Sequence, residues 1–350
     1  MKVLSIGQSS YNFSTLVDSV PAEGSENFYR EVTEGGSGSA ANVAYMLGKY
    51  GLESYLGSVA GDDTYGNLLR KELEGVGVHT EFMETAYEKR TPVSITMINK
   101  QTKIKTVTNI IKDELVMKKT DYLMDPDIVY TDGTDYGASL AALNRYPNKI
   151  TVLGAKAPSK DVLELCKYCN YIIATKEFAE FVTGLIIDYN NINSLVTVYS
   201  ALLNKFVKKT IIVTLGSHGA LYMSDNQIKV MPGLNMEVLD TTGSGDFFRG
   251  AYVYALSQNY DIERAVTFAN IASCLSATKM GTRTAIPDIS DIMTYFEQKY
   301  PPVQQSPAAT AQPQATQAAA QAPAADPSAQ AAPVNPAPAP TESTPNVGNQ

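Results

Sequence analysis

The sequence predicts an α/β fold in which helices flank both faces of a mainly parallel central sheet, with a second, small β-sheet beside it. Strand-like and helix-like stretches alternate from residue 1 to about residue 300, which is typical of strands joined by crossover helices. Two segments, 13–34 and 91–110, interrupt this alternation with short strand-like runs. Residues 301–350 have a composition that cannot form an apolar core.

Hydrophobic periodicity places the individual elements. The apolar run at 3–7 predicts the first strand. Apolar residues from Ala40 to Leu47 recur at the i, i+3, i+4, i+7 spacing of an amphipathic helix, and Gly51 stands near its expected end. Further strands are expected at 54–60, 127–131, 149–153, 171–174 and 210–215, and further helices at 67–74, 245–257, 262–278 and 289–298.

The two interrupting segments predict the small sheet. Thr91, Val93, Ile95 and Met97 alternate with their neighbours at a period of two, as strand residues do. Neither segment is followed directly by a helix, so both are expected to project from the main domain. A lid over an active site and a hairpin that only packs on the domain both fit this pattern.

The segment 301–350 differs from the rest of the chain in composition. It contains 15 Ala, 11 Pro and 8 Gln and no Lys, Arg or aromatic residue. Proline at this density interrupts every alanine run, so the segment is expected to be a disordered tail. The folded domain is therefore expected to span about 1–300.

Charge and cysteine content exclude several classes of protein. The net charge of −8, without a basic stripe, argues against nucleic acid or an anionic membrane as a partner. The apolar run at the start is shorter than the core of a secretion signal. Three cysteines without such a signal are typical of a reducing cytoplasm, which is the expected location.

Cys166 and Cys169 form a CxxC pair, a spacing found in zinc and redox sites. There is no second CxxC, and His79 and His218 are the only histidines, too few for an obvious four-ligand zinc site. We therefore expect two semi-buried cysteines on a helix.

The most informative stretch is DTTGSGDFFRGA, residues 240–251. The small residues at 243–245 leave the backbone bare just before a helix that is expected to begin near Asp246. A helix N-terminus presents free N–H groups and binds anions, and phosphoryl transfer needs such donors together with a base for the attacking hydroxyl. An ordinary glycine turn with a helix-capping charge would explain a bare GxGD equally well.

The longer string closely resembles the second signature of the ribokinase-like (pfkB) carbohydrate kinases. The resemblance implies that Asp246 is the catalytic base and that the backbone N–H groups of Gly243, Ser244 and Gly245 form an anion hole. It also implies a ribokinase-like fold whose small β-sheet is a lid over the site.

Residues 35–44, GGSGSAANVA, resemble the first signature of the same family. The resemblance implies that Gly36, Gly38 and Asn42 bind the sugar, since bare glycines admit a polyol and an amide both donates to and accepts from hydroxyls. A glycine turn before a helix is the bland alternative. Family members usually carry a substrate-binding aspartate where this chain has Asn12, which loses a charge-assisted hydrogen bond.

The ATP-binding residues are predicted from VTLGSHGA, residues 213–220, which resembles the family's strand-end loop. The resemblance implies ATP contacts for Thr214, Gly216 and Gly219, and for Asn270 beside the adenine, with His218 as a bystander. The family's Asn-x-x-Glu motif for Mg²⁺ should fall at 175–178 but is absent. Of the nearby acids, Glu177 is favoured over Glu180 as its replacement.

The implied cofactors are ATP and Mg²⁺, with a monovalent cation as a further candidate. The main interpretation is an ATP-dependent sugar kinase with a small-molecule sugar substrate and a homodimer formed through the lid. A nucleoside kinase of the same fold is the first alternative; an aromatic-rich base pocket would distinguish it, and Tyr11 and Phe13 beside Asn12 leave that open. A catalytically weak binding or regulatory protein on the kinase fold is the second, suggested by Asn12 and the missing motif.

Overall fold

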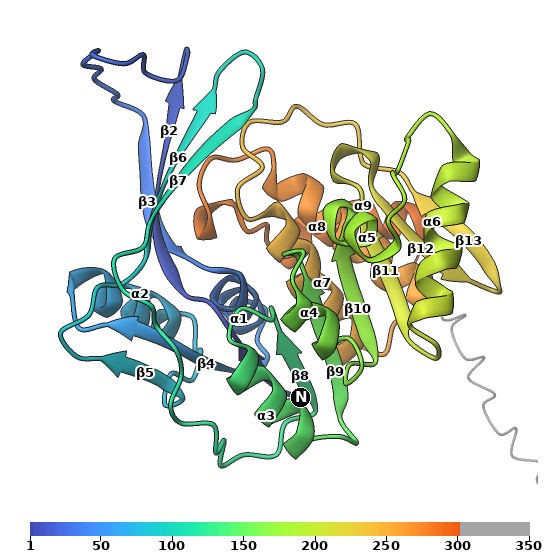
Figure 1. Cartoon of the computed structure of the whole chain (residues 1–350). Coiled ribbons are helices and arrows are strands. Elements are labelled where there is room, and N and C mark those ends of the chain that lie inside the picture. Colours follow the sequence, from blue (N-terminus) through green and yellow to red (C-terminus); the bar gives the residue numbers. More distant parts are fainter. Residues whose placement is uncertain (302–350) are drawn as a thin grey trace, which may run out of the picture. The chain divides into compact units, whose positions relative to one another are not determined.

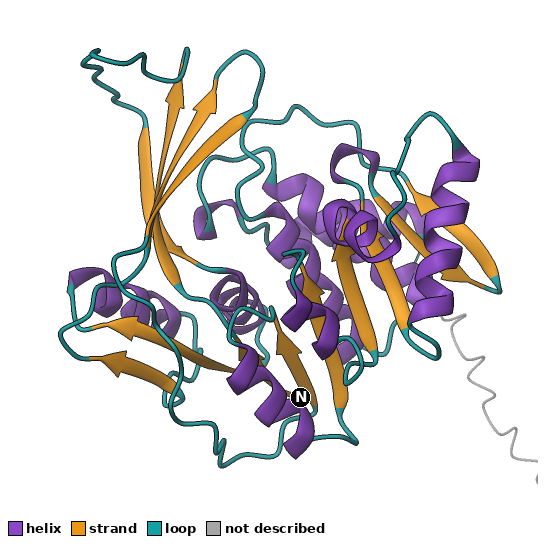
Figure 2. Cartoon of the chain, viewed as in Figure 1, coloured by secondary structure: helices purple, strands orange, loops and turns teal. Residues whose placement is uncertain are grey.

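The computed structural model describes residues 1–301, which form two β-sheets and the helices that cover the larger one (Figure 1, Figure 2). The predicted tail lies outside the described residues from position 302 onward. Within the described part, no helix combines the length and apolar character needed to cross a membrane.

Nine strands form the central sheet in the order β13-β12-β11-β10-β9-β8-β1-β4-β5. From β11 to β5 neighbouring strands are parallel, whereas the pairs β11–β12 and β12–β13 are antiparallel. The predicted mainly parallel sheet is confirmed, and the β12–β13 hairpin at its edge was not predicted. The strands are β1 (Lys2–Ile6), β4 (Glu53–Gly61), β5 (Met83–Ala86), β8 (Ile128–Thr131), β9 (Ile150–Ala155), β10 (Tyr171–Thr175), β11 (Thr210–Thr214), β12 (Ala220–Ser224) and β13 (Gln227–Met231).

Helices cover both faces of this sheet, and each face has its own apolar cluster. Successive residues of β1 illustrate the division, because Val3 packs in one cluster and Leu4 in the other. On the Val3 side lie α1 (Ser39–Lys49), α2 (Thr64–Gly75), α7 (Ser244–Ser257), α8 (Ile262–Ser276) and α9 (Ile289–Lys299). On the Leu4 side lie α3 (Tyr136–Arg145), α4 (Lys160–Leu165), α5 (Lys176–Thr183) and α6 (Ile192–Lys205). Burial of both faces explains why these strands read as continuous apolar runs.

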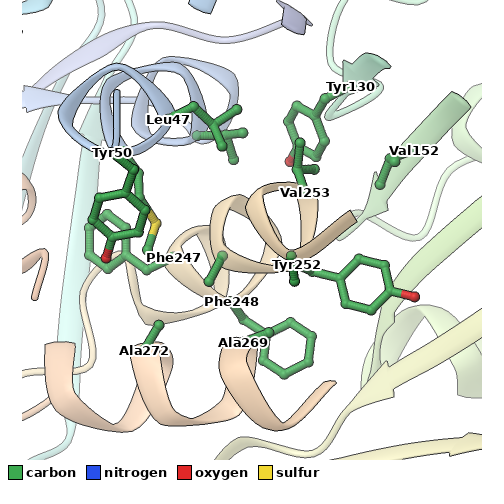
Figure 3. Packing of buried hydrophobic residues seen from close by; sticks show 14 of the residues in the cluster. Leu47, Tyr50, Tyr130, Val152, Phe247, Phe248, Tyr252, Val253, Ala269 and Ala272 are labelled. Atoms are coloured by element: carbon green, nitrogen blue, oxygen red, sulfur yellow. The ribbon is translucent and has the colours of Figure 1, made fainter. Parts of the chain in front are cut away.

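Helix α7 is the central element of the first cluster (Figure 3). Leu47 of α1 and Ala269 of α8 pack against it from two directions, and the Phe247 side chain is fully buried. Small residues on α7 and α8 allow their backbones to approach closely. The N-terminus of α7, which carries Asp246, is therefore held by a rigid core.

The small sheet has four strands in the order β3-β2-β6-β7. They are β2 (Ser10–Val17), β3 (Val32–Ser37), β6 (Val93–Asn99) and β7 (Lys105–Ile110). β2 and β6 pair in parallel, and the outer pairs are antiparallel. Compared with the predicted segments, β2 begins before residue 13 and β3 continues past residue 34. In Figure 1 this sheet projects from the central sheet at the upper left.

Two local expectations were wrong in detail. α4 ends at Leu165, so Cys166 and Cys169 follow the helix, and both side chains are completely buried. Burial raises the pKa of the Cys166 thiol to about 12, and no cluster of metal-binding side chains occurs in residues 1–301. α2 begins at Thr64, earlier than predicted, because the Asp63 side chain accepts a hydrogen bond from the Gly66 amide and caps it.

Candidate active site

Helix α7 begins directly after a left-handed glycine. Gly243 has a φ of 80° and forms the N-cap, and a Cβ there would lie 2.8 Å from the Phe247 ring. Both the backbone angle and the close approach require glycine. The helix starts at Ser244, slightly earlier than predicted, which places Asp246 in the first turn at the positive end of the helix dipole.

The Asp246 carboxylate is buried and is held by three donors. Its Oδ1 accepts hydrogen bonds from Ser39 Oγ at 2.6 Å and from Arg249 Nη1 at 3.2 Å. Its Oδ2 accepts one from Asn42 Nδ2 at 3.0 Å. Ser39 and Asn42 lie in the first turn of α1, so the two signature motifs meet at this carboxylate.

These contacts determine the protonation state of Asp246. Burial acts to raise its pKa, but the charges of Lys156 and Arg249 and the hydrogen bonds from Ser39 and Asn42 together lower it below the ordinary value. Asp246 is therefore ionised at neutral pH and able to accept a proton.

Backbone N–H groups beside Asp246 are free to bind an anion. The Ser244 amide donates to the Thr241 carbonyl oxygen at 3.3 Å, so one of the three predicted anion-hole donors is already engaged. The amides of Gly243 and Gly245 have no acceptor among the described residues. These two amides and the helix dipole make the start of α7 a candidate anion site.

A lysine of the small sheet reaches this same loop. Lys105 Nζ of β7 donates to the Thr241 carbonyl oxygen at 3.1 Å. Desolvation lowers the pKa of Lys105, with the Asp240 charge opposing the shift and the Lys156 charge adding to it. Two ammonium groups, one from the small sheet and one that follows β9, therefore influence the region around Asp246.

Asp132, directly after β8, organises the start of α1. Its Oδ2 accepts from the amides of Gln8 and Ala40, each at 2.9 Å, and its Oδ1 accepts from the amide and hydroxyl of Thr134. Gly7 contacts this carboxylate so closely that a Cβ would overlap it. Burial raises the pKa of Asp132 in spite of these four donors. The carboxylate thus fixes the β1–β2 turn against the helix that carries Ser39 and Asn42.

Asn12 lies on a polar face of the small sheet. Its Oδ1 accepts from Ser94 Oγ at 2.8 Å and from Thr96 Oγ1 at 2.9 Å, and its Nδ2 donates to Ser14 Oγ at 2.7 Å. Most of its hydrogen-bonding capacity is therefore used within the sheet. Tyr11, the neighbouring residue in β2, points to the opposite face and stacks on Tyr65 with the ring centroids 5.0 Å apart.

The other predicted sugar-binding residues, Gly36, Gly38 and Asn42, lie at the end of β3 and the start of α1. Gly38 has a φ of 97° and packs against the backbone of Gln8, and Gly36 packs against the Arg283 guanidinium. Asn42 Oδ1 is buried without a hydrogen-bond donor among the described residues. A hydroxyl group of a ligand could supply that donor.

The predicted nucleotide residues lie at the carboxyl end of β11. Thr214 ends that strand, and a short 3₁₀ turn, Gly216–His218, follows it. Gly219 has a φ of 89° and packs on the Met231 carbonyl, whereas Gly216, with a φ of 61°, faces open space. Asn270 of α8 donates from Nδ2 to the Pro232 carbonyl at 2.8 Å, which leaves its Oδ1 available. His218 stacks on Tyr189, with no contact to Asp246.

Comparison with known proteins decides the family. A model described as pfkB family carbohydrate kinase matches residues 1–289. The chain belongs to the pfkB family of carbohydrate kinases. It is 24% identical over 307 residues to an ATP-dependent ribose-1-phosphate kinase of Halopiger xanaduensis, covering 86% of this chain and 99% of that protein. It is 24% identical over 275 residues to the ribokinase of Haemophilus influenzae, covering 76% and 88%.

Solved structures give the same fold for this pfkB kinase. An Escherichia coli structure described as a ribokinase II in complex with ATP and Mg²⁺ aligns with a TM-score of 0.71 at 18% identity, covering 85% of this chain and 99% of that chain. The expected ribokinase-like fold is thus confirmed, and the family match confirms the carbohydrate kinase activity expected from the two signatures.

The pfkB kinase departs from the family at the expected metal motif. Thr175 replaces the asparagine and caps α5, accepting from the Phe178 amide at 3.2 Å. Glu180 is engaged by Lys176 at 3.0 Å and by the Ile187 amide at 2.8 Å. Glu177 is exposed in the first turn of α5, beside the ends of β10 and β11. Mg²⁺ usually keeps several waters and needs only one or two protein carboxylates, so the single carboxylate of Glu177 is compatible with the role.

Three side chains of the candidate site were not predicted from the sequence. Arg249 stands inside the quoted motif, and a charged residue among the apolar and small residues of the expected helix was the available signal. Asp132 follows a buried strand, a position where functional carboxylates are common in parallel sheets. Lys105 gave no signal, because its proximity to Thr241 depends on how the small sheet is placed.

Proposed function

We propose that this kinase transfers the γ-phosphoryl group of ATP to a hydroxyl group of a sugar or sugar derivative, with Asp246 as the general base. The observation that supports this most directly is the buried, ionised Asp246 carboxylate in the first turn of α7, next to the free amides of Gly243 and Gly245. A base and an anion site within one helical turn are what an in-line transfer to a hydroxyl requires.

The acceptor oxygen bonds to the γ-phosphorus while the bond from that phosphorus to the β,γ-bridging oxygen breaks, and ADP leaves with the electron pair. The acceptor proton passes to the Asp246 carboxylate. The Gly243 and Gly245 amides and the Lys105 ammonium would bind the negative charge on the transferring group.

Nucleotide binding is proposed at the carboxyl end of β11, through Thr214, Gly216 and Gly219, with Asn270 beside the base. Mg²⁺, when bound, would neutralise phosphate charge, and Glu177 is the carboxylate we propose to hold it through water. A monovalent cation remains a prediction from the family resemblance.

The orientation of the aromatic residues favours a sugar over a nucleoside. Tyr11 lies on the face of the small sheet opposite the Asn12 side chain and packs with Phe13 and Tyr65. The face that carries Asn12 also carries Ser14, Ser94 and Thr96. Hydroxyls and amides match a polyol, whereas a nucleobase needs an apolar pocket.

The apolar face of the small sheet supports a homodimer formed through this sheet. A cavity of about 610 Å³ lies on it, lined by Phe13, Tyr65, Val93, Ile95 and other apolar residues, and by Asp63, Arg90 and Lys112 among other polar residues. A second copy of the sheet would cover this surface, as the family resemblance implies.

The test of the proposed reaction is a coupled ADP-release assay over hexoses, pentoses, sugar acids, phosphosugars and nucleosides, with the Asp246→Asn variant in parallel. The variant keeps an acceptor for Ser39 and should fold and bind ATP. We expect turnover to fall by roughly 10²- to 10⁴-fold, since the amide cannot take the proton. Turnover within a few-fold of the wild type would refute the assignment of the base.

A further inference from the structure

A polar cavity of about 140 Å³ lies beside Asn12. It is enclosed by β3, α1, α2 and the loop that follows α8. Its lining consists of Asn12, Thr33, Glu34, Gly35, Tyr45, Glu72, Thr282, Arg283 and Thr284. Only one of these residues, Arg283, carries a positive charge.

Arg283 is buried with part of its guanidinium unpaired. The residue is 6% exposed, and Nη1 donates to Glu72 Oε2 at 2.8 Å. The guanidinium carbon lies 4.8 Å from the centre of the Tyr45 ring. Nε and Nη2 have no acceptor within residues 1–301, although buried donors are normally satisfied. These two atoms form the edge of the guanidinium that binds a carboxylate or phosphate through two parallel hydrogen bonds.

The loop that carries Arg283 contacts both signature segments of the candidate active site. The Gly281 amide donates to Asp240 Oδ2 at 2.9 Å, at the start of the second signature. Thr282 Oγ1 donates to the Gly36 carbonyl at 2.8 Å, within the first. Tyr45 follows Asn42 by three residues on α1, so the cavity lies about one helical turn, roughly 5 Å, from the group that holds Asp246. That distance is comparable with the width of one sugar ring.

We propose that Arg283 binds an anionic substituent, a carboxylate or phosphate, on the sugar that this kinase phosphorylates. The inference rests on the proposed function and specifies its substrate class. Glu72 neutralises the Nη1 side only, and Glu34 is exposed on the rim. Asn12 stands where family members usually have an aspartate, so it adds no third carboxylate to Glu34 and Glu72 in the lining.

Matched variants of the ion pair separate anion binding from a structural role. Arg283→Met should lower kcat/KM for phosphosugars or sugar acids by roughly 10- to 100-fold, the range for a lost charge-assisted pair, and change it little for neutral sugars. Glu72→Gln removes the competing charge and should improve kcat/KM for the anionic class a few-fold. Both variants break the same ion pair, so a purely structural role would make both worse.

Arg283→Lys supplies a third arm, because it keeps the charge and loses the two-pronged edge. Its kcat/KM for anionic sugars should lie between those of the wild type and Arg283→Met, and the wild-type preference should weaken at higher ionic strength. Ribose 5-phosphate and gluconate, each compared with its neutral parent sugar, distinguish a phosphate from a carboxylate requirement.

The outcomes distinguish this inference from the proposed function. Turnover on neutral sugars with none on anionic ones would overturn the role of Arg283 and leave the kinase reaction intact. If no acceptor is turned over, the proposed reaction is wrong. Calorimetric binding of ribose 5-phosphate and gluconate to the wild type and Arg283→Met then decides the inference separately, and equal or absent binding in both proteins overturns it.

Discussion

Asp246 illustrates how a buried carboxylate keeps its charge. Removal from water favours the neutral acid, yet Ser39, Asn42 and Arg249 donate to it, and Lys156 adds a second positive charge. Lowering the pKa secures the ionised form but reduces basicity, so in the proposed reaction Asp246 would take the proton only as the hydroxyl oxygen bonds to phosphorus.

The pH dependence of the kinase should report this balance. The pKa of Asp246 lies below its ordinary value of 3.8, and proton acceptance is lost as the pH falls through that pKa. Lys156→Met removes the largest charge that lowers it, so the acid limb of kcat/KM should move to higher pH. The control is Lys160→Met, a neighbouring exposed lysine that is not among the charges affecting Asp246. Equal limbs in both variants would contradict this account.

The two signature motifs identified residues of the candidate site but not their hydrogen-bond partners. Asp246 and Asn42 could be picked from the sequence because each belongs to a recognisable string. That Asn42 donates to Asp246 could not, since 204 positions separate them and only the packing of α1 on α7 brings them together. The same holds for Ser39, whose hydroxyl would otherwise be taken for a helix cap.

The small sheet contributes a positive charge near the start of α7, in addition to the apolar surface proposed for dimer formation. Lys105 on β7 contacts the Thr241 carbonyl in the loop that precedes α7. Lys105→Met should lower kcat by roughly 10- to 100-fold, with a smaller effect on the KM for the sugar, because the ammonium would act on the transferring group. Lys100→Met, in the same hairpin but paired with Asp18, is the control. A change confined to KM would assign Lys105 to substrate binding.

The loop after β11 offers a matched pair of glycines. Gly216 and Gly219 both have positive φ angles, but only at Gly219 would a Cβ meet backbone, the Met231 carbonyl. Gly216→Ala should cost about 1 kcal/mol of unfolding free energy, from the backbone strain alone. Gly219→Ala should cost roughly 3 kcal/mol or more, since the β12–β13 hairpin must shift. Urea unfolding of both variants measures the difference, and equal losses would show that the hairpin yields easily.

The period-two pattern of residues 91–97 was enough to predict a strand, but not which side faces the active site. Tyr11 and Asn12 show why: alternation assigns neighbours to opposite faces, and only the contacts with Tyr65, Ser94 and Thr96 identify each face. The β12–β13 hairpin escaped prediction because its short strands lack a turn of the usual Asn-Gly kind. Asp225 and Asn226 adopt the required positive φ angles without glycine.

For the whole molecule, the apolar face of the small sheet has a consequence for assembly. Ile95→Asp would place a charge in the cavity of about 610 Å³ on that face and should convert a dimer into a monomer. Ile186→Asp, at a side chain that is 80% exposed outside that cavity, should leave the assembly unchanged. Light scattering after gel filtration gives the mass of each. A wild-type monomer at micromolar concentration would contradict the proposal.

The long sequence separation of the bonds at Asp246 has a consequence for how the active enzyme comes into being. Ser39 and Asp246 are 207 positions apart, and Arg283 and Glu72 are 211 apart. During synthesis the ribosome must therefore reach Asp246, about four-fifths of the way through residues 1–301, before the first signature meets its partner. Contacts between residues so far apart in the sequence form slowly during folding. If Asp246 is the base, as proposed, a nascent chain that has formed only β1 and α1 lacks it, and phosphoryl transfer would begin only when the domain is complete.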